Sequence, residues 1–227
     1  MCMISAGLTK DFGVLGADSA MHNISNGETT FETGKLSFVR GKYLMAFIGT
    51  NLYFSRIDFN RFDLEFKQVS LYLSDYLKGI KEDVEKELAL EIKDKDDRKP
   101  HFCLYLLGTH NNKPMLAQFN SFRDFEARYL WSENGVKFSN IVYGDNTEKN
   151  DVFKASVSHM EELSKKYENP SPGIVGEILT RGIYKKADLE EKIGDKKKYA
   201  GGVVNCGVVF NNGAIRPLSG LEVIYGR

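Results

Sequence analysis

Short apolar runs separated by polar turns dominate the first fifty residues. Residues 3–8 ("MISAGL") and 13–19 ("GVLGADS") are apolar and rich in small residues, and the intervening "TKDFG" has the composition of a hairpin turn. Residues 35–39 ("KLSFV") and 43–49 ("YLMAFIG") form a second such pair around "RGK". We therefore expect two β-hairpins, joined by a loop over the polar stretch 23–34.

A helical period replaces this pattern after Asn51. Apolar residues recur at steps of three and four and define one helix face: Leu73, Leu77, Ile80, Val84, Leu88 and Ile92. The charges between them are the solvated face, and the run 93–100 ("KDKDDRKP") ends the helix at a proline.

Strands return in the second half of the chain. Residues 101–109 and 114–120 are predicted to form a hairpin around "NNK", and 137–145 a further strand. The segment 201–220 ("GGVVNCGVVFNNGAIRPLSG") closes the chain as an apolar hairpin with "NNG" at its turn.

Two helices are expected between those strands. The first has one apolar face, made of Phe153, Val157, Met160, Leu163 and Tyr167. The second covers 173–184, after the prolines and glycine of "NPSPG", and the charged run 185–198 that follows is interpreted as solvated surface. The order of elements predicts an α+β domain, 1–227, with strands stacked on strands and helices on the outer faces.

Composition excludes several classes of protein. Lys+Arg and Asp+Glu balance at 31 each, which argues against a general nucleic-acid or anionic-membrane binder. The start of the chain does not have the pattern of a signal peptide, and no apolar run reaches the length of a membrane span, so a cytoplasmic protein is expected. Cys2, Cys103 and Cys206 form no CxxC pair, so neither a disulfide framework nor a zinc site is predicted. Cys103 and Cys206 lie inside apolar runs and are interpreted as buried structural residues.

Cys2 directly follows the initiator methionine. Methionine before such a small residue is normally removed in the cytosol, which leaves Cys2 as the first residue. Its thiol is then a nucleophile, and its own α-amine, with an ordinary pKa of about 8, is a base. An N-terminal nucleophile also needs a cation, a carboxylate that holds the cation, and an N–H group for the oxyanion. Lys35, Asp18 and Gly49 are the candidates, because each lies at a predicted strand end.

The motifs around these residues carry a resemblance to a known family. "GVLGADS", "GKLSFV" and "YLMAFIGT", with the closing "YAGGVVNCGVVFNNG", resemble the proteasome β-type and HslV-like peptidases, which are N-terminal nucleophile hydrolases. Counted from Cys2, Asp18 falls at the family spacing, and Lys35 and Gly49 fit after a one-residue insertion. The resemblance extends over essentially the whole chain in the order of its elements.

The resemblance implies a four-layer αββα sandwich and a peptidase or amidase without metal or cofactor. It also implies a homo-oligomeric ring and an ATP-dependent unfoldase as a partner. It places Phe47 at the base of the main substrate pocket, with core filling as the alternative role. Met21 and His22 are expected to border the substrate cleft, with a surface-loop role for His22 as the alternative.

The chain also departs from the family pattern. Cys2 replaces the usual threonine, and Tyr143, Lys197 and Ala200 occupy positions where family members support the terminal amine; Asp195 is a candidate substitute. Two alternatives therefore remain open. One is a catalytically inactive, proteasome-like structural subunit. The other is a small-molecule acylamide hydrolase of the penicillin V acylase type, which the Met-Cys start suggests.

Overall fold

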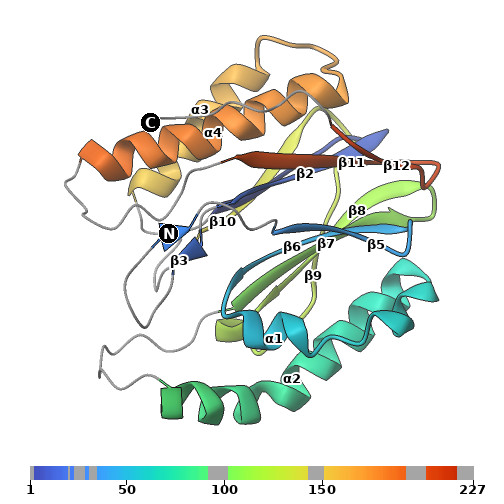
Figure 1. Ribbon diagram of the computed structural model, residues 1–227. Helices are drawn as coiled ribbons and strands as arrows, with labels where there is room; N and C mark the ends of the chain where they lie inside the picture. The colour runs from blue at the N-terminus through green and yellow to red at the C-terminus, as the bar shows by residue number, and fades with distance from the viewer. Residues whose placement is uncertain are drawn as a thin grey trace.

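The computed structural model describes residues 3–19, 21–22, 29–30, 35–91, 102–142, 151–192 and 203–218, and these form two five-stranded antiparallel β-sheets, a separate two-stranded sheet and helices (Figure 1). In spatial order, the first sheet contains β10 (Lys137–Val142), β1 (Met3–Leu8), β2 (Phe12–Asp18), β11 (Val204–Phe210) and β12 (Ile215–Pro217). The second contains β5 (Leu36–Val39), β6 (Tyr43–Gly49), β7 (Phe102–His110), β8 (Lys113–Asn120) and β9 (Arg128–Leu130). The four predicted hairpins are confirmed.

Two details of the strand prediction are wrong. The stretch 23–34, expected as a loop, contains β4 (Thr29–Thr30), which pairs with β3 (Met21–His22). Residues 128–130 form β9 at the edge of the second sheet and were not expected as a strand. Both elements have only two or three residues, too few to show a period in the sequence.

The helices are α1 (Asn51–Ser55), α2 (Phe66–Glu91), α3 (Asp151–Ser164) and α4 (Pro172–Lys192). In the apolar face predicted for α2, Leu73, Leu77, Val84 and Leu88 are buried and Ile80 is partly buried. Ile92 lies outside the described residues. Tyr167 does not belong to the face of α3, because that helix ends at Ser164 and Tyr167 is 43% exposed. The interpretation of the charged run as solvated surface is also wrong in part. Helix α4 continues through it to Lys192, and Lys186 is fully buried.

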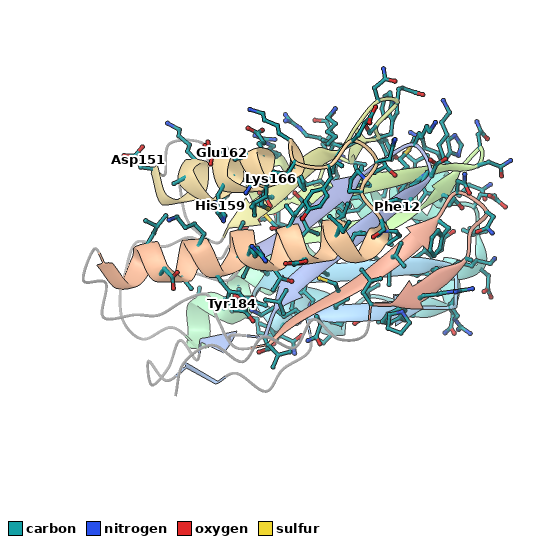
Figure 2. The ribbon with its side chains drawn as sticks, turned by 90° about the horizontal axis from the view of Figure 1, so that it is seen from above. Phe12, Asp151, His159, Glu162, Lys166 and Tyr184 are labelled. Carbon is teal, nitrogen blue, oxygen red and sulfur yellow. The ribbon has the colours of Figure 1, made fainter. Side chains whose placement is uncertain are left out.

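Three apolar cores separate the layers. Alternate residues of each strand point to opposite faces, so Ile4 and Leu15 of the first sheet meet Leu44 of the second between the sheets. Val14 faces the other way, into a core with residues of α3 and α4, which lie side by side over the first sheet (Figure 2). Met45 packs instead with residues of α2 on the outer face of the second sheet. The prediction of an α+β fold with two antiparallel sheets and helices on their outer faces is confirmed.

The two ends of the sheets differ in their connections. Tight turns join β1 to β2, β5 to β6, β7 to β8 and β11 to β12, all at one end, which we call the turn end. At the opposite end, β1, β5, β7 and β11 begin and β2, β6 and β10 finish. We call this the open end.

No helix in the described ranges is both long enough and apolar enough to cross a membrane.

Candidate active site

Asp18 lies at the open end because of the register of the first sheet. Ile4 pairs with Ala17, so Met3 is level with Asp18 across the β1–β2 ladder. Asp18 pairs on its other side with Val204, the first residue of β11. The end of β2 is therefore enclosed by the beginnings of its two neighbouring strands.

Lys35 connects this position to the second sheet. Its Nζ lies 2.6 Å from Oδ1 of Asp18, and the two side chains are only 3% and 0% exposed. Removing two charges from water is unfavourable unless they pair closely. Burial of this ion pair at a strand end therefore carries a desolvation cost that its close contact must offset. The structure thus brings together two of the predicted site residues, 17 positions apart in sequence, one at the end of β2 and the other just before β5.

Gly49, the last residue of β6, has an unusual backbone. Its φ is 105°, a value that side-chain-bearing residues rarely adopt. Gly49 pairs with Phe102 of β7, and the Phe102 N–H donates to Ser121 Oγ, on the side away from β6. The two residues are therefore a non-hydrogen-bonded pair of the ladder, and the Gly49 N–H points away from β7, to the side of β5. Lys35 immediately precedes β5, so this N–H is directed to the same side as the lysine.

Cys2 lies outside the described residues, as do Tyr143, Asp195, Lys197 and Ala200. Met3, the residue bonded to Cys2, begins β1 at the open end. Met21 and His22 form β3 shortly after Asp18, and their side chains are outside the described part of the chain. Their expected place at a substrate cleft remains a prediction.

Phe47 fills the core between the second sheet and its helices. It is 7% exposed, and its ring stacks on Phe54 of α1 with centroids 4.2 Å apart and on Phe102 at 5.9 Å. Core filling is thus one role that the structure shows for Phe47. Its role in a substrate pocket remains a prediction.

Ser19 lies at the open end beside Asp18 and was not predicted from the sequence as a site residue. Its side chain is 3% exposed, and its Oγ accepts a hydrogen bond of 3.0 Å from the N–H of Val203. This bond ties the chain just after Asp18 to the start of β11. Its position in "ADS", directly after the aspartate, was the available signal.

The cysteines inside strands are buried, as predicted. Burial raises the pKa of the Cys206 thiol to about 12, against a smaller lowering by its hydrogen bond with Thr180. Burial raises the pKa of Cys103 as well, with a smaller opposing effect from Arg123. Both thiols are protonated at neutral pH and are poor nucleophiles. Nucleophilic thiol chemistry in this chain would therefore fall to Cys2.

Beyond the candidate nucleophile site, the described residues and the comparisons with known proteins indicate no further kind of catalytic or metal site. No group of three or more His, Cys, Asp or Glu residues suited to a metal ion occurs in the part of the chain that the structure describes. A comparison with protein-family models finds no match, and a search of curated proteins finds none either. The functional argument therefore rests on the site residues themselves and on the motifs quoted above.

Proposed function

We propose that this chain is an N-terminal nucleophile hydrolase of the proteasome-like αββα type, which cleaves peptide or other amide bonds with Cys2. The observation that carries the proposal is the buried Lys35–Asp18 ion pair, which joins the two sheets at the end where Met3 begins β1. A buried ion pair is seldom more stabilising than apolar residues of the same size, so stability alone gives little reason to keep one. A lysine held beside an N-terminal cysteine has a chemical use that explains the burial.

The first step is attack by the thiolate. Removal of Met1 frees the α-amine of Cys2, which accepts the thiol proton. The positive charge of Lys35 favours the thiolate and the neutral amine, since a nearby cation lowers both pKa values. Asp18 fixes the position of the Lys35 ammonium through the 2.6 Å contact. The sulfur then adds to the amide carbonyl carbon, and the carbonyl oxygen becomes an oxyanion.

The second step is collapse of the tetrahedral intermediate. The Gly49 N–H, directed away from the β6–β7 ladder, is suited to donate to the oxyanion. The protonated amine gives its proton to the leaving nitrogen, the C–N bond breaks, and a thioester remains on Cys2. Water, deprotonated by the α-amine, attacks the thioester, and the acid product leaves with the thiol restored.

A non-catalytic subunit of the same fold is the second candidate. The residues at three family support positions, Tyr143, Lys197 and Ala200, favour it. The Lys35–Asp18 pair favours the enzyme, because a purely structural subunit has no need of a buried lysine at this strand end.

The test is whether Cys2 is a free and activated N-terminus. Intact mass measurement of protein from its native host is expected to show loss of Met1. A thiol-reactive amide probe, followed by peptide mapping, is expected to label Cys2 and not Cys103 or Cys206. Lys35→Ala is expected to abolish the labelling. Lys81→Ala is the matched control, because Lys81 also pairs with a carboxylate, Asp124 at 3.1 Å, on the far side of the second sheet.

Two results would contradict the proposal. Retention of Met1 locks the nitrogen in a peptide bond, where it cannot act as a base. Equal labelling of the wild type and Lys35→Ala shows that Lys35 does not activate the thiol. Turnover of small acylamides but not of peptides identifies the enzyme as an acylamide hydrolase.

A further inference from the structure

Asparagine followed by glycine occurs three times in the chain, at 26–27, 134–135 and 212–213. Such a pair can rearrange without an enzyme, because the glycine nitrogen can attack the Cγ of the asparagine side chain, and glycine has no side chain to block the approach. The attack needs a glycine N–H and an asparagine amide that are not held by other hydrogen bonds. Asn26 and Gly27 lie outside the described residues, so the structure compares the other two pairs.

The Asn212–Gly213 pair is held by the turn between β11 and β12. The Gly213 N–H donates to the carbonyl of Phe210 at 2.9 Å, and the Asn212 Oδ1 accepts from the N–H of Ala214 at 3.0 Å. The attacking nitrogen and the amide that it would attack are therefore each bonded to another group. Attack would break both hydrogen bonds, so the fold protects this pair.

The Asn134–Gly135 pair lies in the connection from β9 to β10, and both residues are exposed. The hydrogen bonds of this connection use only the carbonyls of the pair, since Ser132 Oγ donates to Asn134 O at 3.0 Å and to Gly135 O at 3.2 Å. In the described part of the chain, neither the Gly135 N–H nor the Asn134 amide is engaged. Nothing lies within 4 Å of where a Cβ of Gly135 would stand, so the backbone beside the nitrogen is uncrowded.

Beyond the function proposed above, we propose that Asn134 is a modification site, which deamidates spontaneously to aspartate and isoaspartate through a succinimide. The Gly135 nitrogen forms a bond with Asn134 Cγ, the bond from Cγ to Nδ2 breaks, and Nδ2 leaves as ammonia with the proton of the Gly135 N–H. Water then opens the ring. Hydrolysis at Cγ gives aspartate, and hydrolysis at the main-chain carbonyl gives isoaspartate. Water is the one co-reactant.

Isoaspartate alters the backbone of a segment that joins the two sheets. β9 ends at Leu130 in the second sheet, and β10 begins at Lys137 in the first. Isoaspartate adds one carbon to the main chain between them and displaces the carbonyl of residue 134. Ser132 is only 8% exposed and donates to that carbonyl, so its buried hydroxyl loses an acceptor. Isoaspartate at 134 therefore loosens this connection.

The added negative charge has the smaller effect. A carboxylate at 134 is adjacent to Glu133, whose Oε1 lies 2.9 Å from Nζ of Lys113. The side chains of Lys113 and Glu133 are 53% and 58% exposed, and exposed charges interact weakly. Asn134→Asp reproduces this charge without the longer backbone, so it separates the two effects.

The experiment ages the full chain at mildly alkaline pH, in buffer and in parallel in concentrated guanidinium chloride. Digestion at acidic pH, where the rearrangement is slow, and mass mapping then assign each gain of about 1 Da to its position. In buffer, the gain is expected at Asn134 and not at Asn212. In denaturant, both positions are expected to react at similar rates, because the hydrogen bonds that protect Asn212 are lost. Asn134→Gln is the control that abolishes the reaction at this position, since its longer side chain closes the ring far more slowly.

Thermal denaturation tests the consequence for the fold. Asn134→Asp is expected to melt at the temperature of the unaged wild type, and the aged wild type, which contains isoaspartate, at a lower temperature. Equal melting temperatures of the aged wild type and Asn134→Asp would overturn the effect on the connection.

The mapping decides the site itself. Equal gains at Asn134 and Asn212 in buffer, or no gain at either, would show that the hydrogen bonds of the fold do not select the reactive pair, which overturns the inference. Neither measurement depends on Cys2, so this inference and the proposed function can fail separately.

Discussion

The two ends of this molecule are held together by different kinds of interaction. At the turn end, each connection is short and is closed by local hydrogen bonds, and the N–H of Asn211 also donates to the distant carbonyl of Asp11 at 2.8 Å. The hydroxyl of Thr9 accepts from the N–H of Phe12 at 3.0 Å and donates to its carbonyl at 2.9 Å. Asn111 and Asn112 have φ values of 52° and 56°, as a two-residue hairpin turn with the right-handed twist of strands requires.

At the open end, the stabilising contacts join residues that are distant in sequence. Asp18 ends β2 of the first sheet and pairs with Lys35, which precedes β5 of the second, and Ser19 accepts from Val203, 184 positions later. These groups are polar or charged and buried, so each depends on its partner remaining in place. The comparison teaches that short turns close each hairpin at the turn end, whereas the open end depends on buried polar contacts between distant parts of the chain.

The largest expected effect comes from breaking the buried ion pair. Lys35→Met leaves the Asp18 carboxylate buried without its lysine, and removing one partner of such a pair destabilises a protein by about 3–5 kcal/mol. The double variant Lys35→Met/Asp18→Leu is expected to regain most of that stability and still to leave Cys2 unlabelled. Urea denaturation measures the first effect and probe labelling the second.

This double variant separates stability from chemistry at the open end. If the probe labels Cys2 of the double variant at the wild-type rate, the ion pair has only a structural role. The difference between the two ends then gives no support for catalysis at the open end.

A smaller effect is expected at the turn end from Gly41→Ala. Gly41 has a φ of 64° and nothing within 4 Å of where its Cβ would stand, so the whole penalty is conformational, about 1–2 kcal/mol. Thermal denaturation measures it, and labelling of Cys2 is expected to stay unchanged.

Gly79→Ala in α2 is the matched control for that substitution. Gly79 also has open space, but it lies in a helix, where alanine is favoured by about 0.5–1 kcal/mol. The same chemical change is thus expected to stabilise the protein. Loss of stability at both glycines would refute the conformational explanation.

The smallest effect at neutral pH is expected for Tyr53→Phe. The Tyr53 hydroxyl is buried without a hydrogen-bond partner in the described ranges, and burial, with a lesser contribution from Glu85, raises its pKa to about 12. At pH 7 the variant is expected to lie within about 0.5 kcal/mol of the wild type, because no hydrogen bond is lost.

At alkaline pH, Tyr53→Phe is expected to differ from the wild type in its free energy of unfolding. In the unfolded chain the pKa of Tyr53 has its ordinary value of 10.0, below the pKa in the folded protein. The stability contributed by the neutral hydroxyl is therefore complete below pH 10.0 and is lost as the pH rises through about 12. Near pH 11 the variant is expected to exceed the wild type by about 1 kcal/mol. Tyr43→Phe is the control, since it also removes a hydrogen bond to Leu64 and is destabilised at pH 7. Equal alkaline sensitivity of Tyr53→Phe and the wild type would contradict the assignment.

Much of the fold could be predicted because its signals are local. The hairpins follow from short apolar runs flanking "RGK", "NNK" and "NNG", and α2 follows from an apolar period that spans several turns. The sequence pattern predicted the wrong structure where an element was short or where burial against other elements set the structure. β9 has only three residues, and the charged run after Tyr184 continues a helix because its face is buried against other elements.

The candidate site was predictable only as a set of strand ends. A resemblance in spacing singled out Asp18 and Lys35. Ser19 was marked only by its place directly after Asp18, and Lys186 by no pattern in the sequence. A lysine in a run of lysines and glutamates looks solvated, and its burial depends on which helix face meets the sheet.

The sequence by itself determined the hairpins, the long helices, the burial of Cys103 and Cys206, and a cysteine directly behind the first methionine, because these depend on neighbouring residues. Only the tertiary structure decided that Asp18 and Lys35 touch, that the Gly49 N–H points to the side of β5, and that α4 buries Lys186. Those relations depend on sheet register and on the direction of packed elements. Both are set by contacts between distant parts of the chain, which local patterns do not record.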